Sequence, residues 1–236
     1  MKIVFLGTGV AVNVENRAQQ SILIDGEKII MVDCGYGTML RLGQAGYGVE
    51  DIDSMVITHF HLDHCGELMG LLKARWLLNA GKLDIYAPHG CKSFIESFLQ
   101  SSPYLRGKLK YRLHEVSEGD VFTPSGLKFQ ARKTVHSMES LGYIVEDVLI
   151  SGDTSAFPEL YEDAEIAVHE MSLSFGGKAD FHTSPENFAK NAQNIKKAHL
   201  VHLYPPAFSN RGEIKKYLEK KGIKVDFPED LQILEI

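Results

Sequence analysis

The segment VITHFHLDHC, residues 56–65, places four ionisable side chains directly after a run of apolar residues. They are His59, His61, Asp63 and His64. In an extended backbone, residues two apart point to the same side, so the first two histidines share a face. The fold must therefore contain a buried strand whose end opens either on water or on a strong partner that these groups share.

A metal ion is the partner that this spacing favours. Imidazole nitrogens and carboxylate oxygens are suitable ligands for Zn²⁺, Mn²⁺ or Fe²⁺. One ion cannot easily take four ligands from so short a stretch. Two adjacent ions can, with His59 and His61 on one and Asp63 and His64 on the other. If these side chains were only solvated, nothing would account for their close spacing, so we predict a site for two metal ions.

Three further candidate ligands stand at the ends of predicted strands. They are His136 after ARKTV, Asp153 after VLISG and His202 after AHLV. Strand ends lie at the rim of a sheet, where α/β proteins commonly build their sites. Taken alone, a strand-end histidine is usually a surface residue, and the aspartate in SGDT looks like a turn residue. Together with the histidine-rich segment, they are predicted to complete the two ligand sets.

The rest of the chain alternates strand-like apolar runs with helical patterns, and no linker or low-complexity tract interrupts it. Strands are predicted over 2–7, 21–25, 28–33, 54–58, 83–88, 109–116, 127–135, 141–147, 148–151, 165–170, 198–203 and 231–236. Helices are predicted over 36–46, 66–81 with Gly81 as C-cap, 93–101, 184–195 with Ser184 as N-cap and Pro185 following, and 211–222 closed by Gly222. This succession indicates one α/β domain over 1–236, in two halves that divide near residue 110, with two sheets face to face and helices outside.

Composition narrows the class of protein further. A chain of 236 residues can bury one large core, and a net charge of −6 does not favour broad electrostatic capture of nucleic acid. Three cysteines, Cys34, Cys65 and Cys91, show no CxxC spacing, so no disulfide framework is expected. No signal peptide and no apolar run of about 18 residues is present. A cytoplasmic protein without a membrane partner is therefore expected.

The segment THFHLDHCGE resembles the signature of the metallo-β-lactamase-fold hydrolases, and the three strand-end ligands follow in that family's order. The resemblance extends over nearly the whole chain through FLGTG, DCGYGT, HSMESLGY, SGDT, VHE and HTSPE. Within the superfamily, the chain is most similar to the ribonuclease Z-like phosphodiesterase branch. This resemblance implies a four-layer αββα sandwich with two mixed sheets, and a site that holds two metal ions, usually zinc.

The resemblance also assigns the ligands to individual ions. It implies one ion on His59, His61 and His136, a second on Asp63, His64 and His202, and Asp153 as the bridge between them. The oxygen-reducing diiron relatives carry a glutamate where this chain has His61, so zinc or manganese hydrolysis is favoured over redox chemistry. The β-lactamases with cysteine at the position of Asp153 are set apart in the same way.

Two metal ions suggest a hydrolytic mechanism. A hydroxide shared by the ions would attack a phosphoryl or carbonyl centre, since metal binding lowers the pKa of water toward about 7. Asp63 is suited both to ligate and to orient it. In the ribonuclease Z relatives, residues that match His182 in FHTSPE and Glu170 in AVHEMS assist phosphodiester cleavage. The alternatives are a loop histidine that caps its own turn and a glutamate that is merely solvated.

Several departures from the transfer-RNA processing enzymes bear on the substrate. The chain has no long exosite arm, and its NVENRA segment keeps Arg17 of the PxKxRN loop but places Glu15 where it would repel a phosphate backbone. Tyr36 stands where those enzymes often have glutamate, and HLYPPAF replaces a segment with serine and arginine. We therefore predict hydrolysis of a small or single-stranded nucleotide phosphodiester.

Three alternatives stay open at this point. They are transfer-RNA 3′ processing, hydrolysis of a carboxylic ester, thioester or lactone, and a non-catalytic relative that only binds a ligand. The complete set of ligand-type residues argues against the last of these. The family often dimerises, so a homodimer is compatible with the resemblance, although no separate interface signal stands out.

Overall fold

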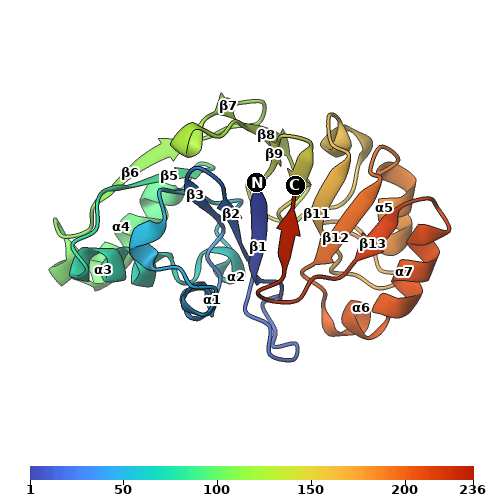
Figure 1. Cartoon of the computed structure of the whole chain (residues 1–236), viewed down its shortest axis with the longest axis horizontal. Helices are drawn as coiled ribbons and strands as arrows, with labels where there is room; N and C mark the ends of the chain where they lie inside the picture. The colour runs from blue at the N-terminus through green and yellow to red at the C-terminus, as the bar shows by residue number, and fades with distance from the viewer.

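Two seven-stranded sheets make up the centre of the computed structural model, which describes residues 1–236 (Figure 1). The first sheet has the order β14-β1-β2-β3-β4-β5-β6 and the second the order β13-β12-β11-β10-β9-β8-β7. The strands of the first are β1 (Lys2–Gly7), β2 (Ser21–Asp25), β3 (Ile29–Val32), β4 (Ser54–Val56), β5 (Leu83–Ala87), β6 (Tyr111–Glu115) and β14 (Ile233–Glu235). Those of the second are β7 (Val121–Phe122), β8 (Phe129–Lys133), β9 (Leu141–Val145), β10 (Val148–Ile150), β11 (Ile166–Glu170), β12 (Lys197–Val201) and β13 (Lys224–Asp226).

Both sheets are mixed, and strand directions follow the same succession in each. From β14 to β3 neighbouring strands are antiparallel, and from β3 to β6 they are parallel. From β7 to β10 they are again antiparallel, and from β10 to β13 parallel. Parallel strands bring their carboxyl ends to one edge of a sheet, where the loops that follow them meet.

Apolar side chains from the facing surfaces of the two sheets form the central core. Ile3 and Phe5 of β1 contribute to it from one side, and Tyr143 and Val145 of β9 from the other. Residues two apart in a strand share a face, so the residues between them point to the outer surfaces. Each outer surface forms its own core with the helices that cover it.

The helices lie on the two outer faces, at the left and right of Figure 1. They are α1 (Thr38–Gln44), α3 (Leu68–Leu77) and α4 (Cys91–Ser101) beside the first sheet, and α5 (Pro185–Asn191), α6 (Pro205–Ser209) and α7 (Arg211–Glu219) beside the second. The predicted αββα sandwich is thus confirmed. None of the helices combines the length and the apolar character that a membrane crossing requires.

The boundary between the sheets differs from the division predicted near residue 110. Strand β6 follows that point but pairs in parallel with β5, in the register Leu83↔Tyr111. The last strand, β14, returns to the first sheet and pairs with β1. The two termini are consequently adjacent, and the amino group of Met1 donates a hydrogen bond to the carbonyl of Ile236 at 3.0 Å (Figure 1).

Two of the three predicted helix ends agree with the structure. The hydroxyl of Ser184 accepts a hydrogen bond from the Asn187 backbone at 3.3 Å, as an N-cap does. Gly222 adopts the left-handed conformation (φ 88°) after α7. The prediction for Gly81 was wrong, because α3 ends earlier and Asn79 takes the left-handed position (φ 53°). Asparagine tolerates this conformation better than most residues.

Candidate metal centre

The histidine-rich segment begins just beyond β4 and contains one short helical turn, α2 (Leu62–Cys65). The carbonyl of His61 accepts hydrogen bonds from the backbone N–H groups of His64 and Cys65, at 2.9 and 3.1 Å. Asp63 and His64 therefore lie on a helical turn. The turn fixes the direction of both side chains relative to His61.

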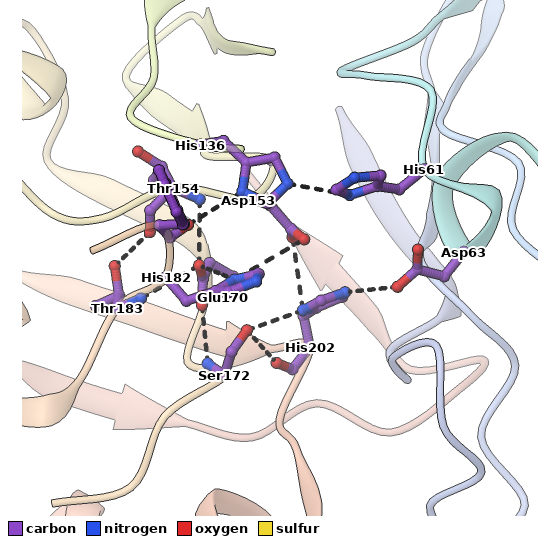
Figure 2. Close-up of polar contacts among 12 residues, drawn as sticks. His61, Asp63, His136, Asp153, Thr154, Glu170, Ser172, His182, Thr183 and His202 are labelled. Carbon is purple, nitrogen blue, oxygen red and sulfur yellow. Dashed lines mark hydrogen bonds and ion pairs between the residues drawn. The ribbon is translucent and has the colours of Figure 1, made fainter. Parts of the chain in front are cut away.

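All seven predicted ligands come together at the edge of the two sheets, beyond the ends of β4, β8, β10 and β12. His61 and Asp63 extend from the first half of the chain toward residues of the second half (Figure 2). Three overlapping sets of possible ligand atoms each lie within 4.8 Å: His59, His61, His136 and Asp153; Asp63, His64 and His202; and Asp153, His182 and His202.

In the first set, three imidazole nitrogens surround one point. The Nδ1 atom of His61 lies 3.1 Å from Nε2 of His59 and 3.0 Å from Nε2 of His136. A tetrahedral zinc ion with Zn–N bonds of about 2.0–2.1 Å separates its ligand atoms by about 3.3 Å. The spacing of these nitrogens therefore fits a shared cation.

The second set has the same spacing. The Nε2 atom of His202 lies 3.3 Å from Nε2 of His64 and 3.2 Å from Oδ2 of Asp63. Asp153 joins the two sets, with Oδ1 3.3 Å from Nε2 of His64 and Oδ2 3.9 Å from Nε2 of His59. Its Oδ1 atom is buried and accepts no hydrogen bond within the protein. A buried carboxylate oxygen without a donor fits a position between two cations.

Comparison with known proteins places this arrangement in a family. Residues 1–220 match the family described as "Anti-Pycsar protein Apyc1". The chain belongs to the Apyc1 family. A ribonuclease Z from Methanosarcina mazei is 35% identical over 146 residues, which are 61% of this chain and 47% of that enzyme. The chain thus spans about half the length of this curated relative.

Solved structures share the fold of this Apyc1-family chain. The metallo-β-lactamase-fold protein YhfI from Bacillus subtilis has a TM-score of 0.82 at 20% identity, covering 99% of this chain and 98% of YhfI. The short form of human tRNase Z has a TM-score of 0.76 at 23% identity, covering 100% and 99%. The predicted metallo-β-lactamase fold and the ribonuclease Z-like resemblance are confirmed.

In this Apyc1-family chain, a second ring of hydrogen bonds orients the imidazoles. Oδ2 of Asp33 lies 2.7 Å from Nδ1 of His64, and the same carboxylate accepts bonds from the Thr58 backbone and hydroxyl, each at 2.8 Å. The hydroxyl of Ser172 lies 3.0 Å from Nδ1 of His202. Such partners hold the proton on Nδ1 and leave Nε2 directed at the centre.

Sequence reasoning did not identify Asp33, Thr58 or Ser172. Asp33 had a usable signal, because it directly follows a buried strand in the DCGYGT segment, as the predicted ligands follow theirs. Thr58 and Ser172 had none, since buried hydroxyls are common at strand ends.

The pKa values of the ligand residues are strongly shifted. Burial opposes ionisation of Asp63, but a hydrogen bond from His202 and the charge of His64 lower its pKa to about 2. Burial and the charge of His64 lower the pKa of His59. Burial also favours neutral His64, but Asp153 and Asp33 outweigh it and raise the pKa of that imidazole. A proton on His64 therefore competes with a metal ion for the space beside Asp153.

Glu170 and His182 form a hydrogen-bonded pair next to the two ligand sets. Glu170 ends β11 with 1% of its surface exposed, and its Oε1 accepts a hydrogen bond from Nδ1 of His182 at 2.9 Å (Figure 2). The same carboxylate also accepts backbone hydrogen bonds from Thr154, Thr183 and Ser172. Glu170 is therefore not a solvated side chain, and His182 does not cap its own turn.

Proposed function

We propose that this chain is a dinuclear metal-dependent hydrolase that cleaves a small or single-stranded nucleotide phosphodiester. The observation that carries the proposal is the convergence of seven ligand-type side chains in two sets that share one carboxylate. One divalent ion would be held by His59, His61 and His136, the other by Asp63, His64 and His202, and both by Asp153. Zinc suits this mixture of nitrogen and oxygen ligands, with manganese as the alternative. When bound, the two ions lower the pKa of water toward about 7 and polarise a phosphoryl oxygen.

The residues around the ions have separate tasks. Asp63 orients the attacking oxygen from the side of the first sheet. Glu170 accepts a hydrogen bond from Nδ1–H of His182, which leaves Nε2 of that imidazole as the atom that can give a proton to the leaving group. Burial opposes a charge on His182, but the hydrogen bond and charge of Glu170 raise its pKa. A general acid of this kind typically contributes about 10²- to 10⁴-fold to the rate.

The loop that carries Arg17 supports a small substrate. The Arg17 guanidinium donates hydrogen bonds to the Thr8 hydroxyl and, at 2.7 Å, to the carbonyl of Pro228, so it ties this loop to the C-terminal segment. Glu15 is exposed in the same loop, beside Glu229. These contacts leave the guanidinium of Arg17 unavailable to a substrate, and the carboxylate of Glu15 is exposed. The negative charge of Glu15 disfavours binding of a long phosphate backbone at this loop.

Transfer-RNA 3′ processing is the second candidate, because the curated relative from Methanosarcina mazei is named ribonuclease Z. Both candidates use the same ions and the same proton donor. They differ in how large a surface outside the site must bind the substrate, since a transfer RNA is a long polyanion and a small diester is not.

A substrate panel tests the proposal. Protein loaded with Zn²⁺ or Mn²⁺ is expected to hydrolyse bis-p-nitrophenyl phosphate and small cyclic or dinucleotide diesters faster than p-nitrophenyl acetate or a lactone. Metal analysis of the same sample is expected to find two ions per chain. Cleavage of a precursor transfer RNA at modest salt, without turnover of small diesters, would favour the second candidate. Preferential turnover of the acetate or the lactone would refute phosphodiester hydrolysis.

A further inference from the structure

Tyr204 lies at the rim of the candidate metal centre, two residues after His202. Its ring meets the imidazole of His202 edge to face, with centroids 6.1 Å apart at 84°, and that of His182 at 6.0 Å and 81°. The two imidazoles are nearly parallel, 6.1 Å apart at 19°. The phenol therefore stands beside both a proposed ligand and the proposed proton donor.

The backbone restricts where this ring can go. Tyr204 precedes Pro205 and has the extended conformation (φ −64°, ψ 159°) that a residue before proline favours. The ring also packs in part against the apolar core between the second sheet and its helices. Tyr204 is thus held in one place while its hydroxyl remains at the rim.

The hydroxyl of Tyr204 forms no hydrogen bond within the protein, unlike those of several other tyrosines. Tyr47 donates to Oδ2 of Asp25 at 2.8 Å, Tyr143 to the carbonyl of Ile57 at 2.7 Å, and Tyr161 pairs with Nε2 of His169 at 2.9 Å. A half-buried phenol beside a reaction centre, with its donor free, is available to a bound molecule.

The same region offers few cationic side chains to an anion. Asp63, Asp153 and Glu170 form ion pairs with histidines only, and no lysine or arginine contacts these carboxylates. A phosphoryl oxygen that points away from the metal ions must therefore be met by an imidazole or by a neutral donor. A neutral hydrogen-bond donor stabilises the single negative charge of a phosphodiester better than the two negative charges of a phosphomonoester.

We propose that the Tyr204 hydroxyl donates a hydrogen bond to a non-bridging phosphoryl oxygen of the bound diester. Tyr204 is then a catalytic residue that selects singly charged phosphodiesters over phosphomonoesters and carboxylic esters. This inference rests on the proposed function and adds the group that recognises the phosphoryl oxygen.

The variant Tyr204→Phe removes the hydroxyl and keeps the ring. Its kcat/KM for bis-p-nitrophenyl phosphate is expected to fall about 10- to 100-fold, the effect of losing a hydrogen bond to a charged group. The fall for p-nitrophenyl acetate is expected to be smaller. Tyr104→Phe, at an exposed tyrosine whose ring forms cation–π interactions with Lys73 and Lys108, is the matched control. Equal metal content and equal melting temperatures show that Tyr204→Phe is folded and loaded.

A binding measurement separates this inference from the proposed function. Inorganic phosphate added to metal-loaded wild-type protein is expected to change the tyrosine absorbance difference spectrum, and Tyr204→Phe is expected to lose that change. If wild-type protein hydrolyses the diester and Tyr204→Phe matches it, the role of Tyr204 is refuted while the proposed function stands. If wild-type protein hydrolyses no diester, the proposed function fails. The phosphate spectrum then decides about Tyr204, since a signal unchanged in the variant would overturn its role.

Discussion

The two sheets share one succession of strand directions but contribute to the candidate metal centre in different ways. The first sheet supplies four of the seven ligands from a single stretch, residues 59–64, which follows β4. The second supplies three ligands from three separate segments, at residues 136, 153 and 202, which follow β8, β10 and β12. The candidate ligands from the first sheet are therefore close together in the sequence, and those from the second sheet are far apart.

The comparison shows how a candidate site for two ions can be divided between a local motif and side chains assembled from separate segments. The fourth strand of each sheet, β3 or β10, is followed by an aspartate, Asp33 or Asp153. Asp33 supports an imidazole from behind, whereas Asp153 lies between the two ligand sets. The second sheet also supplies the Glu170–His182 pair, which has no counterpart in the first. Four predictions test this division, in order of decreasing effect.

Asp153→Asn should have the largest effect, because this carboxylate is the point where the two halves meet. Removing its charge weakens both ion sites, so activity is expected to fall about 1,000-fold or more and the metal content below two ions per chain. Metal analysis and diester turnover measure both. Asp163→Asn, at an exposed aspartate that pairs with Arg132, is the control. Two ions per chain and full turnover in Asp153→Asn would show that the halves hold their ions independently.

His182→Ala should remove the proposed proton donor, which only the second half supplies. Turnover of a diester is expected to fall about 10²- to 10⁴-fold with the metal content unchanged. Glu170→Gln is expected to lower turnover in the same direction, since it removes the charge that raises the pKa of His182. His114→Ala, at a half-buried histidine paired with Asp84, is the control. A loss of metal ions from His182→Ala would indicate a ligand instead of a proton donor.

Asp33→Asn tests the hydrogen bond that orients His64 in the first-sheet half of the candidate site. The carboxylate behind His64 is replaced by an amide, so affinity for the second ion is expected to fall about 10- to 100-fold, while turnover at saturating metal stays near that of the wild type. Ser172→Ala removes the corresponding partner of His202 in the second half. Its effect is expected to be smaller, because a neutral hydroxyl strengthens an imidazole ligand less than a carboxylate does. Competition with a chelator measures both affinities, and equal losses would contradict this ranking.

Acid should destabilise strands β11 and β12 before the strands of the first sheet. His169 and His199 are buried in the second sheet, and burial lowers the pKa of each below its ordinary value. The folded state then binds fewer protons than the unfolded chain, whose histidines titrate near 6.5. The stability from these two residues is complete above about pH 6.5 and is lost as the pH falls below it, by up to about 1.4 kcal/mol per pH unit for each.

Denaturant unfolding between pH 7 and pH 5 measures that loss, and hydrogen exchange locates it. β11 and β12 are expected to lose protection before the strands of the first sheet, which contain no buried histidine. His199→Leu is expected to reduce the pH dependence, since neither nitrogen of His199 forms a hydrogen bond in the protein. Uniform loss of protection over both sheets would contradict the assignment to these histidines.

Much of the fold could be predicted from the sequence, but the pairing of strands could not. Apolar runs indicated twelve of the strands, whereas β7 has only two residues and β13 has one apolar residue, Val225, between two charged ones. Nothing local shows that β6 extends the first sheet or that β14 returns to it. Strand partners are chosen by contacts between segments far apart in the chain, and these contacts leave little trace in either segment alone.

The candidate site shows the same limit. Ligand-type residues could be predicted because histidine and aspartate directly after buried strands are costly to leave unpaired. Asp33 carried the same signal and was overlooked, whereas Ser172 and Tyr204 carried none, since only the fold places them beside His202 and His182. The Glu170–His182 bond became visible only when the loop before α5 was placed over the end of β11.

By itself, the sequence indicated the metallo-β-lactamase fold with its αββα layers and the seven candidate ligands. Backbone geometry relates side-chain directions over a few residues, and this is enough to orient the segment from His59 to His64. Only the tertiary structure decided which nitrogens face one another, that Asp153 lies between the two ligand sets, and that Tyr204 stands beside His182. Those distances depend on how two sheets pack across a shared apolar core, because that packing alone sets the separation between the ends of their strands.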